Sequence, residues 1–432
     1  MRYNYTDMDY EVVVVGAGPA GCLAAKYAAK NGAKTLIIEE HASIGSPVQC
    51  AGLLSVNAVR ECEIAPDSRF HPITGAFVYA PDGRRICIAG DEIKAYVVDR
   101  RLFDRALAQN AVREGAEILM RTRAVGMDIQ DPGTRADHRK ILHILTEGEP
   151  DTIEADVIIG ADGIRSHVAR WAGIDTPETI LSGAQLSTVY DFDDPHFVEI
   201  FPGSCAPGFF AWAVPYHDDA RIGLAVRPEP QPQQRAGSRS ESETGSKAEP
   251  GAGSGTVTGS AWDYLQRLVS EHHIISGKCH SGISGIVLGG IPIGTPQKAA
   301  ADGVLITGDA AGQVKPTSGG GVYPGAICAK IAGKIAADAV IDGDTSARRL
   351  AVYDLLWRAK IGRELVIGKR INGWMANLSD SKINRLIEVI DDDELLDLIT
   401  RYGDMDHPSV VVRKLLMNRK SMSVFAKLIR ML

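Results

Sequence analysis

Features that would place this chain of 432 residues in several common classes are absent from it. The seven cysteines are scattered, with no C-x-x-C pair and no closely spaced framework, which argues against a disulfide scaffold and fits a reducing compartment. A net charge of −7 argues against nucleic acid as a partner, because nucleic-acid proteins carry a strongly basic surface. We therefore expect no nucleic-acid binding and no metal site.

Long apolar runs are missing as well. No stretch reaches the roughly 18 consecutive apolar residues of a membrane-spanning helix, because even Gly321–Ile341 is interrupted by Lys330, Lys334 and Asp338. Acidic residues precede the first apolar run, and no basic segment of the secretory type stands before it. We expect a cytoplasmic protein, either soluble or peripheral on the inner face of the membrane.

The first 40 residues do contain a pattern typical of dinucleotide binding. A short β-branched run at Val12–Val15 is followed by glycines, by alanines at helical spacing in Cys22–Lys30, and by a second apolar run at Thr35–Ile38. This order predicts a strand, a turn, a helix and a second strand. Phosphates would lie at the helix N-terminus, where free N–H groups and the helix dipole favour anions.

Small residues and one acid stand where such a nucleotide needs them. Gly16 permits the tight turn, Gly18 lets a pyrophosphate approach the backbone, and Gly21 allows close packing of helix on strand. Glu39 ends the second strand, where a carboxylate can accept hydrogen bonds from both ribose hydroxyls. We expect these four residues, with Ala20 of the same loop, to bind the nucleotide; an isolated glycine triplet would otherwise be a structural turn.

Three further segments decide which nucleotide is bound. Val98–Asp104 precedes a helical pattern, while Asp156–Gly163 and Gly308–Gly312 each end a short apolar run. Together with the first motif they resemble the flavoproteins that include aromatic hydroxylases and geranylgeranyl reductases, in which such segments line one extended FAD. The resemblance implies FAD as the cofactor, with Arg100 near its pyrophosphate and Ala124 near its adenine.

The carboxyl end of the apolar run Val304–Thr307 carries Asp309, which the same resemblance places on the ribityl or phosphate portion of FAD. A carboxylate at a strand end can hold hydroxyl groups, although a single Gly-Asp pair is usually a turn. The glycine-rich loop that follows contains Gly320, Gly321 and Val322 and precedes a long helix. Its amides and the helix dipole could stabilise negative charge on a reduced flavin, the alternative being a flexible loop.

Two more segments narrow the resemblance to archaeal geranylgeranyl reductases. Gly45–Leu53, which includes Cys50, Ala51 and Leu53, resembles the family segment that closes over the flavin. Cys50 is then a candidate proton donor, although a buried thiol is more often inert packing.

Pro207–Pro215 resembles the aromatic signature of the same family, usually Tyr-x-Trp-x-Phe-Pro. Alternation places Phe210, Trp212 and Val214 on one strand face, which could wall a long apolar pocket. We expect Phe210, Trp212 and Pro215 to contact substrate. Phe210 and Val214 replace the usual tyrosine and phenylalanine, so the resemblance supports packing roles and no role for a tyrosyl hydroxyl; the alternative is an ordinary sandwich core.

We predict an α/β fold in which a Rossmann-like FAD-binding domain is interleaved with an antiparallel-sheet substrate domain, followed by a helical C-terminal region. The predicted boundaries are 1–70, 95–175 and 290–345 for the FAD-binding domain, 71–94 and 176–289 for the substrate domain, and 346–432 for the helical region. Residues 228–260 are rich in Pro, Gly, Ser, Glu and Gln, which predicts a disordered insertion.

The resemblance implies an FAD-dependent reductase that saturates C=C bonds of geranylgeranyl ether lipids. No second strand-associated GxGxxG appears, so electrons would come from an external donor, with ferredoxin, a deazaflavin and a nicotinamide all left open. The rival functions are an FAD-dependent monooxygenase of an aromatic or polyketide substrate and a non-catalytic flavin-containing lipid-binding protein. Ser409–Leu432 is basic and apolar, which predicts either a membrane-contacting helix or a helix packed on the body.

Overall fold

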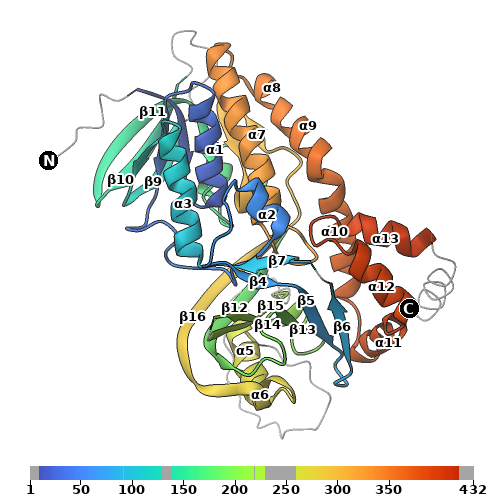
Figure 1. The fold of residues 1–432 in the computed structure, drawn as a ribbon. Helices are drawn as coiled ribbons and strands as arrows, with labels where there is room; N and C mark the ends of the chain where they lie inside the picture. The colour runs from blue at the N-terminus through green and yellow to red at the C-terminus, as the bar shows by residue number, and fades with distance from the viewer. Residues whose placement is uncertain (1–8, 91, 129–138, 218, 229–258, 418–432) are drawn as a thin grey trace, which may run out of the picture.

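The computed structural model describes residues 9–90, 92–128, 139–217, 219–228 and 259–417. Within them the chain forms an eight-stranded sheet, a seven-stranded sheet and a three-stranded sheet. Helices cover one side of the first sheet, and a helical C-terminal region runs down beside both larger sheets (Figure 1). The predicted α/β fold is confirmed.

The eight-stranded sheet has the order β17-β18-β11-β1-β2-β8, with β10 pairing with β11 and β9 with β10. Strands β1, β2, β8, β18 and the second half of β11 run parallel, whereas β9, β10 and β17 are antiparallel to their neighbours. Its strands are β1 (Tyr10–Val15), β2 (Thr35–Ile38), β8 (Glu117–Leu119), β9 (Thr122–Asp128), β10 (Lys140–Thr146), β11 (Glu149–Gly160), β17 (Ala300–Ala301) and β18 (Val304–Ile306).

The parallel core forms because β-branched residues occupy positions that are covered on both faces. Val12, Val13 and Val14 of β1 are fully buried, as is most of β2. Three helices, α1 (Pro19–Lys30), α3 (Arg100–Arg113) and α7 (Val322–Ile341), lie side by side over this sheet (Figure 1). The predicted strand-turn-helix-strand order at the N-terminus is therefore confirmed, and β11 pairs in parallel with β18.

The seven-stranded sheet has the order β16-β12-β15-β14-β13-β5-β6. All its pairs are antiparallel except β5 with β13, which pair in parallel after a long connection. Its strands are β5 (Gly75–Tyr79), β6 (Arg85–Ala89), β12 (Thr179–Tyr190), β13 (Phe197–Pro202), β14 (Phe210–Tyr216), β15 (Asp219–Val226) and β16 (Cys279–Ile293).

A small three-stranded sheet, β3-β7-β4, lies between the two larger sheets. It consists of β3 (Leu53–Ser55), β4 (His71–Ile73) and β7 (Ala95–Val97). Because β4 falls in the predicted substrate domain and β3 and β7 in the predicted FAD-binding domain, this sheet ties the two together. The domain boundaries themselves remain a prediction.

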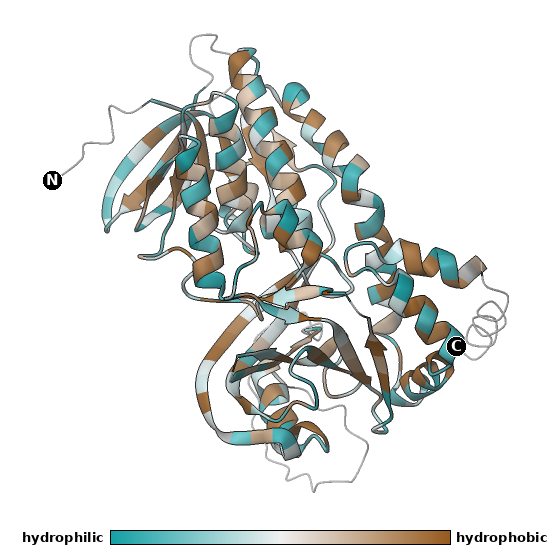
Figure 2. Cartoon of the chain, in the orientation of Figure 1, coloured by the Kyte–Doolittle hydropathy of each residue, from teal (hydrophilic) through white to brown (hydrophobic). Residues whose placement is uncertain are grey.

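The remaining helices follow the expected distribution, with short ones between strands and a helical run after residue 346. They are α2 (Val56–Glu61), α4 (His167–Trp171), α5 (Ala261–Glu271), α6 (Ile275–Lys278), the 3₁₀ turn η2 (Gly308–Ala311), α8 (Ala347–Leu350), α9 (Val352–Trp357), the π-helical turn η3 (Arg358–Gly362), α10 (Arg363–Met375), α11 (Asp380–Ile390), α12 (Asp393–Tyr402) and α13 (Pro408–Met417). Figure 2 shows apolar segments on the strands and alternating apolar and polar bands along the helices.

Two sequence predictions fall largely outside the described residues. Of the predicted insertion 228–260, residues 229–258 are not described, and Ser260 at its end is the N-cap of α5, with a capping box to Asp263. Of the basic C-terminal segment Ser409–Leu432, only the part within α13 is described. Within the described part of the chain, no helix has both the length and the apolarity that crossing a bilayer requires.

Candidate functional site

The turn between β1 and α1 forms an open backbone cradle. Gly16 has φ +103°, and a Cβ there would lie 2.5 Å from the carbonyl oxygen of Ala161. A Cβ on Gly21 would lie 1.9 Å from the Gly16 carbonyl oxygen, so helix and strand approach too closely for any side chain. Gly18, by contrast, is the N-cap of α1, and a Cβ there would meet nothing within 4 Å. That space fits a pyrophosphate at the helix N-terminus.

Glu39 lies directly behind this cradle. Its Oε2 accepts a hydrogen bond from the Ala17 N–H at 2.8 Å, and its Oε1 accepts from the His41 N–H at 2.9 Å. The carbonyl oxygen of Glu39 accepts from the Thr122 N–H at 2.8 Å, which brings the start of β9 alongside. Ala124, two residues further on, therefore lies on the strand that begins beside Glu39. This proximity agrees with a ribose at Glu39 and an adenine near Ala124, and both roles remain predictions.

Arg100 begins α3 and is held by a carboxylate one turn later. Its Nε and Nη2 donate to the two oxygens of Asp104 at 2.9 and 3.0 Å. Burial alone would lower the pKa of Arg100, but Asp104 and the nearby Cys50 together raise it above its ordinary value. The side chain is therefore a fixed cation in the interior, suited to an anion such as a pyrophosphate.

Asp309 lies in the turn η2, which packs against the first motif. A Cβ on Gly308 would lie 2.7 Å from the Cβ of Ala20, and one on Gly321 would lie 2.6 Å from Asp309 Oδ1. Burial raises the pKa of Asp309, an effect that the Arg100 charge partly offsets. Within the described residues the carboxylate of Asp309 has no hydrogen-bond donor, so it is available to the hydroxyls of a ligand.

The loop before α7 contains a second unsatisfied polar group. Ser318 Oγ is buried and has no hydrogen-bond partner within the described residues. Gly321 is the N-cap of α7, and no side chain caps this helix end, so its first N–H groups lack a side-chain partner. An orphan hydroxyl, an orphan carboxylate and uncapped amides together fit the polar edge of a flavin and its ribityl chain. Gly320, Gly321 and Val322 lie where the sequence predicted a flavin-facing loop.

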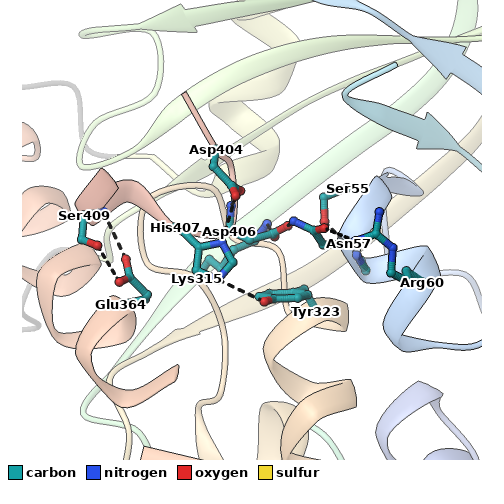
Figure 3. Close-up of polar contacts among 11 residues, drawn as sticks. Ser55, Asn57, Arg60, Lys315, Tyr323, Glu364, Asp404, Asp406, His407 and Ser409 are labelled. Atoms are coloured by element: carbon teal, nitrogen blue, oxygen red, sulfur yellow. Dashed lines mark hydrogen bonds and ion pairs between the residues drawn. The ribbon is translucent and has the colours of Figure 1, made fainter. Parts of the chain in front are cut away.

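Behind this loop, the C-terminal region supplies a polar network that the sequence did not reveal (Figure 3). Lys315 Nζ donates to Asp406 Oδ1 at 2.7 Å, and both side chains are buried. Asp406 Oδ2 accepts from Asn57 Nδ2 of α2 at 3.1 Å. The hydroxyl oxygen of Tyr323, the second residue of α7, lies 3.2 Å from His407 Nε2. The loop is thus fixed from behind by residues more than 80 positions away, which no local motif could indicate.

The segment that contains Cys50 lies over a second half-buried arginine, Arg221. Arg221 Nη1, from β15, donates to the carbonyl oxygens of Ala51 at 2.5 Å and of Val98 at 3.1 Å. Gly52 has φ +74°, and a Cβ there would lie 2.2 Å from Arg221 Nη1. Burial lowers the pKa of Arg221, an effect that the interactions with Cys50, Tyr216 and Asp99 partly offset. Sequence reasoning missed Arg221, although an arginine inside the otherwise apolar strand 220–226 was the available signal.

An apolar cluster lies next to that segment. Trp212 and Val214 pack with Leu53, Val97 and Ile200 on the face of β14 that points toward the small sheet. Ala211 and Ala213 pack on the opposite face, against the side covered by α5. The alternation predicted for β14 is therefore confirmed.

Trp212 of this cluster contacts a second aromatic residue of β14, Phe210. The Phe210 and Trp212 rings meet edge to face at 6.1 Å, and Trp212 Nε1 donates to Gln185 Oε1 at 3.2 Å. By the same alternation Pro215 falls on the other face of the strand from Trp212. The substrate roles of all three residues remain predictions.

Comparison with known proteins agrees with this geometry. The family described as "FAD binding domain" matches residues 9–261. A digeranylgeranylglycerophospholipid reductase from Methanothrix thermoacetophila is 36% identical over 90% of this chain and 93% of its own length. One from Methanothermobacter thermautotrophicus is 33% identical over 89% of this chain and 91% of its own.

Solved structures show the same likeness. A geranylgeranyl bacteriochlorophyll reductase-like protein from Thermoplasma acidophilum is 25% identical with a TM-score of 0.79, over 97% of this chain and 99% of its own. A p-nitrophenol 4-monooxygenase from Pseudomonas putida shares the fold at a TM-score of 0.67 and 15% identity, over 92% of this chain and 98% of its own. The chain belongs to the FAD-binding flavoproteins and, within them, to the digeranylgeranylglycerophospholipid reductase family.

Proposed function

We propose that this protein is an FAD-dependent reductase that saturates isoprenoid C=C bonds of geranylgeranyl chains during the synthesis of archaeal ether lipids. The single observation that supports this most is the position of the segment containing Cys50. On one side it lies against Arg100, and on the other against the apolar face of β14. A redox cofactor and a hydrocarbon chain would meet at this segment.

The chain's own residues would hold the cofactor mainly through backbone and carboxylates. Gly18 leaves room for the pyrophosphate, Glu39 faces the ribose, and Asp309 with Ser318 satisfies polar groups toward the flavin. Reduced FAD, when bound, supplies a hydride equivalent to one carbon of the double bond while a proton completes the neighbouring carbon, so each saturated bond gains two hydrogens. An external donor must then supply two electrons, and ferredoxin, a deazaflavin and a nicotinamide remain the candidates.

An isolated alkene has no carbonyl that a site could polarise. The protein must therefore position the double bond closely and exclude water, which a wall of Phe210, Trp212 and Val214 would do. We propose the Cys50 thiol as the proton donor, because the Gly52 N–H donates to its Sγ at 3.2 Å. The guanidinium groups of Arg100 and Arg221 also lie near this thiol. Arg221 would act as a positioning residue by holding the Ala51 carbonyl.

The decisive experiment is anaerobic. The purified protein is reduced, mixed with an unsaturated archaeal ether lipid, and followed by flavin reoxidation and by mass analysis of the lipid. A mass gain of two hydrogens for each reduced bond is expected. Unchanged lipid with each of the three donor classes would defeat the reductase proposal and leave FAD binding untouched. A comparison of the parent protein with Cys50→Ser and Cys50→Ala then separates proton donation from packing. Serine keeps the approximate size of the side chain but not the acidity of the thiol, and alanine keeps neither.

The same experiment separates the rival functions. A monooxygenase would need oxygen, so turnover without oxygen excludes that function. The likeness of this chain to a monooxygenase at 15% identity concerns the fold and does not indicate the activity. A flavin-containing lipid carrier would stay reduced when given the lipid. Neither rival has an observation in its favour.

A cytoplasmic location with a peripheral membrane contact fits a lipid substrate. The basic C-terminal segment Ser409–Leu432 is one proposed contact, of which α13 is described and packs against α10.

A further inference from the structure

The continuous helix formed by α9, η3 and α10 has two opposite stripes. Its inner stripe consists of buried residues spaced three or four apart: Tyr353, Trp357, Ile361, Leu365, Gly368 and Asn372. Its outer stripe is also spaced three or four residues apart and comprises Leu355, Ala359, Arg363, Val366, Arg370 and Trp374, all of them exposed. The outer stripe runs roughly 30 Å along the helix at about 1.5 Å per residue.

The outer stripe is unusual for a solvent-facing helix surface. Leu355 is 71% exposed, Val366 54% and Trp374 37%, and these apolar residues alternate with arginines. Along the stripe, Arg363 and Arg370, together with the neighbouring Lys360, have no hydrogen bond or ion pair to any described residue. Bands of apolar and polar residues alternate along α9 in Figure 2. An ordinary exposed helix would instead carry mixed charges and few large apolar side chains.

Acidic residues are turned away from this stripe. The helix from 352 to 375 contains only two, Asp354 and Glu364. Asp354 Oδ2 accepts from the Ala299 N–H at 3.0 Å, and Glu364 Oε1 accepts from Ser409 Oγ at 2.6 Å, so both point toward the body of the protein. The outer stripe is therefore uniformly basic and apolar on a chain whose net charge is −7.

We infer that the outer stripe of α9–η3–α10 docks on the surface of an anionic lipid bilayer. Arginines among apolar side chains fit phosphate headgroups above acyl chains, and a tryptophan at the stripe's end fits the interface. A protein partner would have to bring acids to Lys360, Arg363 and Arg370, whereas an anionic bilayer offers phosphates at every point. Because the whole chain is negatively charged, attraction to such a surface must come from a local feature of this kind.

The inner stripe connects the docked helix to the candidate site. A Cβ on Gly368 would lie 3.0 Å from Pro316 of the flavin loop, and Asn372 Oδ1 accepts from Arg227 Nη2 at 3.3 Å at the end of β15. A bilayer held by the outer stripe would thus lie about one helix diameter, roughly 10 Å, from the loop before α7. We rest only this last step on the proposed function, since a reductase of membrane lipids needs its crevice close to the bilayer.

The test is sedimentation of the full-length, FAD-loaded protein with vesicles of phosphatidylglycerol mixed with phosphatidylcholine, and with vesicles of phosphatidylcholine alone. We expect binding to the mixed vesicles only. Arg363→Glu combined with Arg370→Glu should weaken it at least about tenfold, given the contribution of each cation near an anionic surface. Val366→Ser combined with Leu355→Ser should weaken it several-fold without changing charge, about the effect of removing two exposed aliphatic contacts.

The matched control is Arg105→Glu combined with Arg113→Glu on α3, which makes the same change in net charge on another exposed helix. Retained flavin absorbance shows that each variant is folded. Equal losses in the two double variants would reduce the effect to net charge and overturn the proposal. So would absence of binding by the parent protein, or loss on removing residues 418–432 with the stripe variants unaffected. A dimer that the stripe substitutions dissociate would instead make a second copy the occupant.

Vesicle binding is measured without substrate turnover. Its failure would leave the reductase proposal standing, and a failed turnover experiment would leave the docking surface standing.

Discussion

The two large sheets contribute to the candidate site in different ways. The eight-stranded sheet presents backbone: glycines, uncapped helix amides and two carboxylates at the carboxyl ends of β1, β2 and β18. The seven-stranded sheet presents side chains, with Trp212 and Val214 of β14 facing the small sheet. Backbone recognition tolerates almost no substitution where a Cβ has no room, whereas an apolar wall can be built from many combinations. Cofactor binding should therefore be more fragile than substrate binding.

Gly18→Ala should give the largest effect. The new Cβ meets nothing in the protein, so the fold and its thermal stability should be unchanged, but it occupies the space left for the pyrophosphate. We expect FAD affinity to fall about a hundredfold, which is on the order of 3 kcal/mol. Titration of the apoprotein with FAD, followed by flavin fluorescence, measures this.

Gly32→Ala is the control for that substitution. Gly32 follows α1, has φ +97° and also has no neighbour within 4 Å of a Cβ, so alanine there strains the backbone by about 1 kcal/mol without approaching the cradle. It should lower the unfolding free energy and keep FAD affinity. Tight FAD binding by Gly18→Ala would refute the contrast between backbone and side-chain recognition.

Trp212→Ala should come next. Removal of the indole opens the wall of the proposed pocket and leaves Gln185 without its donor, so kcat/KM for long isoprenoid chains should fall roughly 30-fold, about 2 kcal/mol. FAD affinity should stay within about twofold, a free-energy change near 0.4 kcal/mol.

Phe201→Leu tests the other face of the same sheet. Phe201 of β13 stacks on Tyr79 at 4.9 Å within the cluster covered by α5, so this change should cost stability and spare turnover. If both variants lose turnover equally, the face of β14 has no special place in substrate binding.

Arg221→Met should have a smaller effect on turnover, about tenfold, because the charged hydrogen bonds to the Ala51 and Val98 carbonyls contribute roughly 1.5 kcal/mol. A positioning role predicts a lower kcat with KM and FAD affinity little changed. Arg221→Lys should recover part of the rate, because it restores a donor to one carbonyl. A loss of FAD in both variants would show instead that Arg221 supports the fold of the crevice.

Glu63→Gln should give the smallest effect, a loss of unfolding free energy. Glu63 contacts the helices that carry the backbone cradle. Partial burial favours the protonated form, but hydrogen bonds from Lys26, Tyr27 and Lys330 lower the pKa of Glu63 from 4.5 to about 2. The resulting stabilisation is present above about pH 4.5 and disappears as the pH falls toward 2.

With a third of that side chain exposed, we expect a difference of about 1 kcal/mol at neutral pH after solvent screening. Urea unfolding of parent and variant at neutral and acidic pH measures it, with the exposed Glu149→Gln as the control. A difference that persists at the acid end would exclude linkage to this carboxylate.

The parts of the fold that the sequence predicted share a local cause. Val12–Val15, the glycine turn and α1 lie within 20 residues of one another, and each requirement, such as the absent Cβ at Gly21, leaves a mark at a fixed position. The alternation of β14 was readable for the same reason. Such features need no knowledge of the remaining chain.

The parts that the sequence did not predict depend on distant partners. The residues next to Lys315 in the sequence do not indicate that Asp406 neutralises its charge. Those next to Ala51 do not indicate that its carbonyl oxygen accepts a hydrogen bond from Arg221. The parallel pairing of β5 with β13 likewise joins segments that lie more than 100 residues apart in the chain. Long-range ion pairs are satisfied by tertiary geometry, which leaves no spacing rule in the sequence.

The link from Asp406 to Asn57 spans 349 positions of the chain and also reaches Lys315. During synthesis on the ribosome, the N-terminal cradle emerges long before the residues that brace the loop opposite it. The candidate site would therefore lack its bracing residue Asp406 until translation is almost complete. Chains that end before Asp406 should therefore bind the coenzyme more weakly than the full chain.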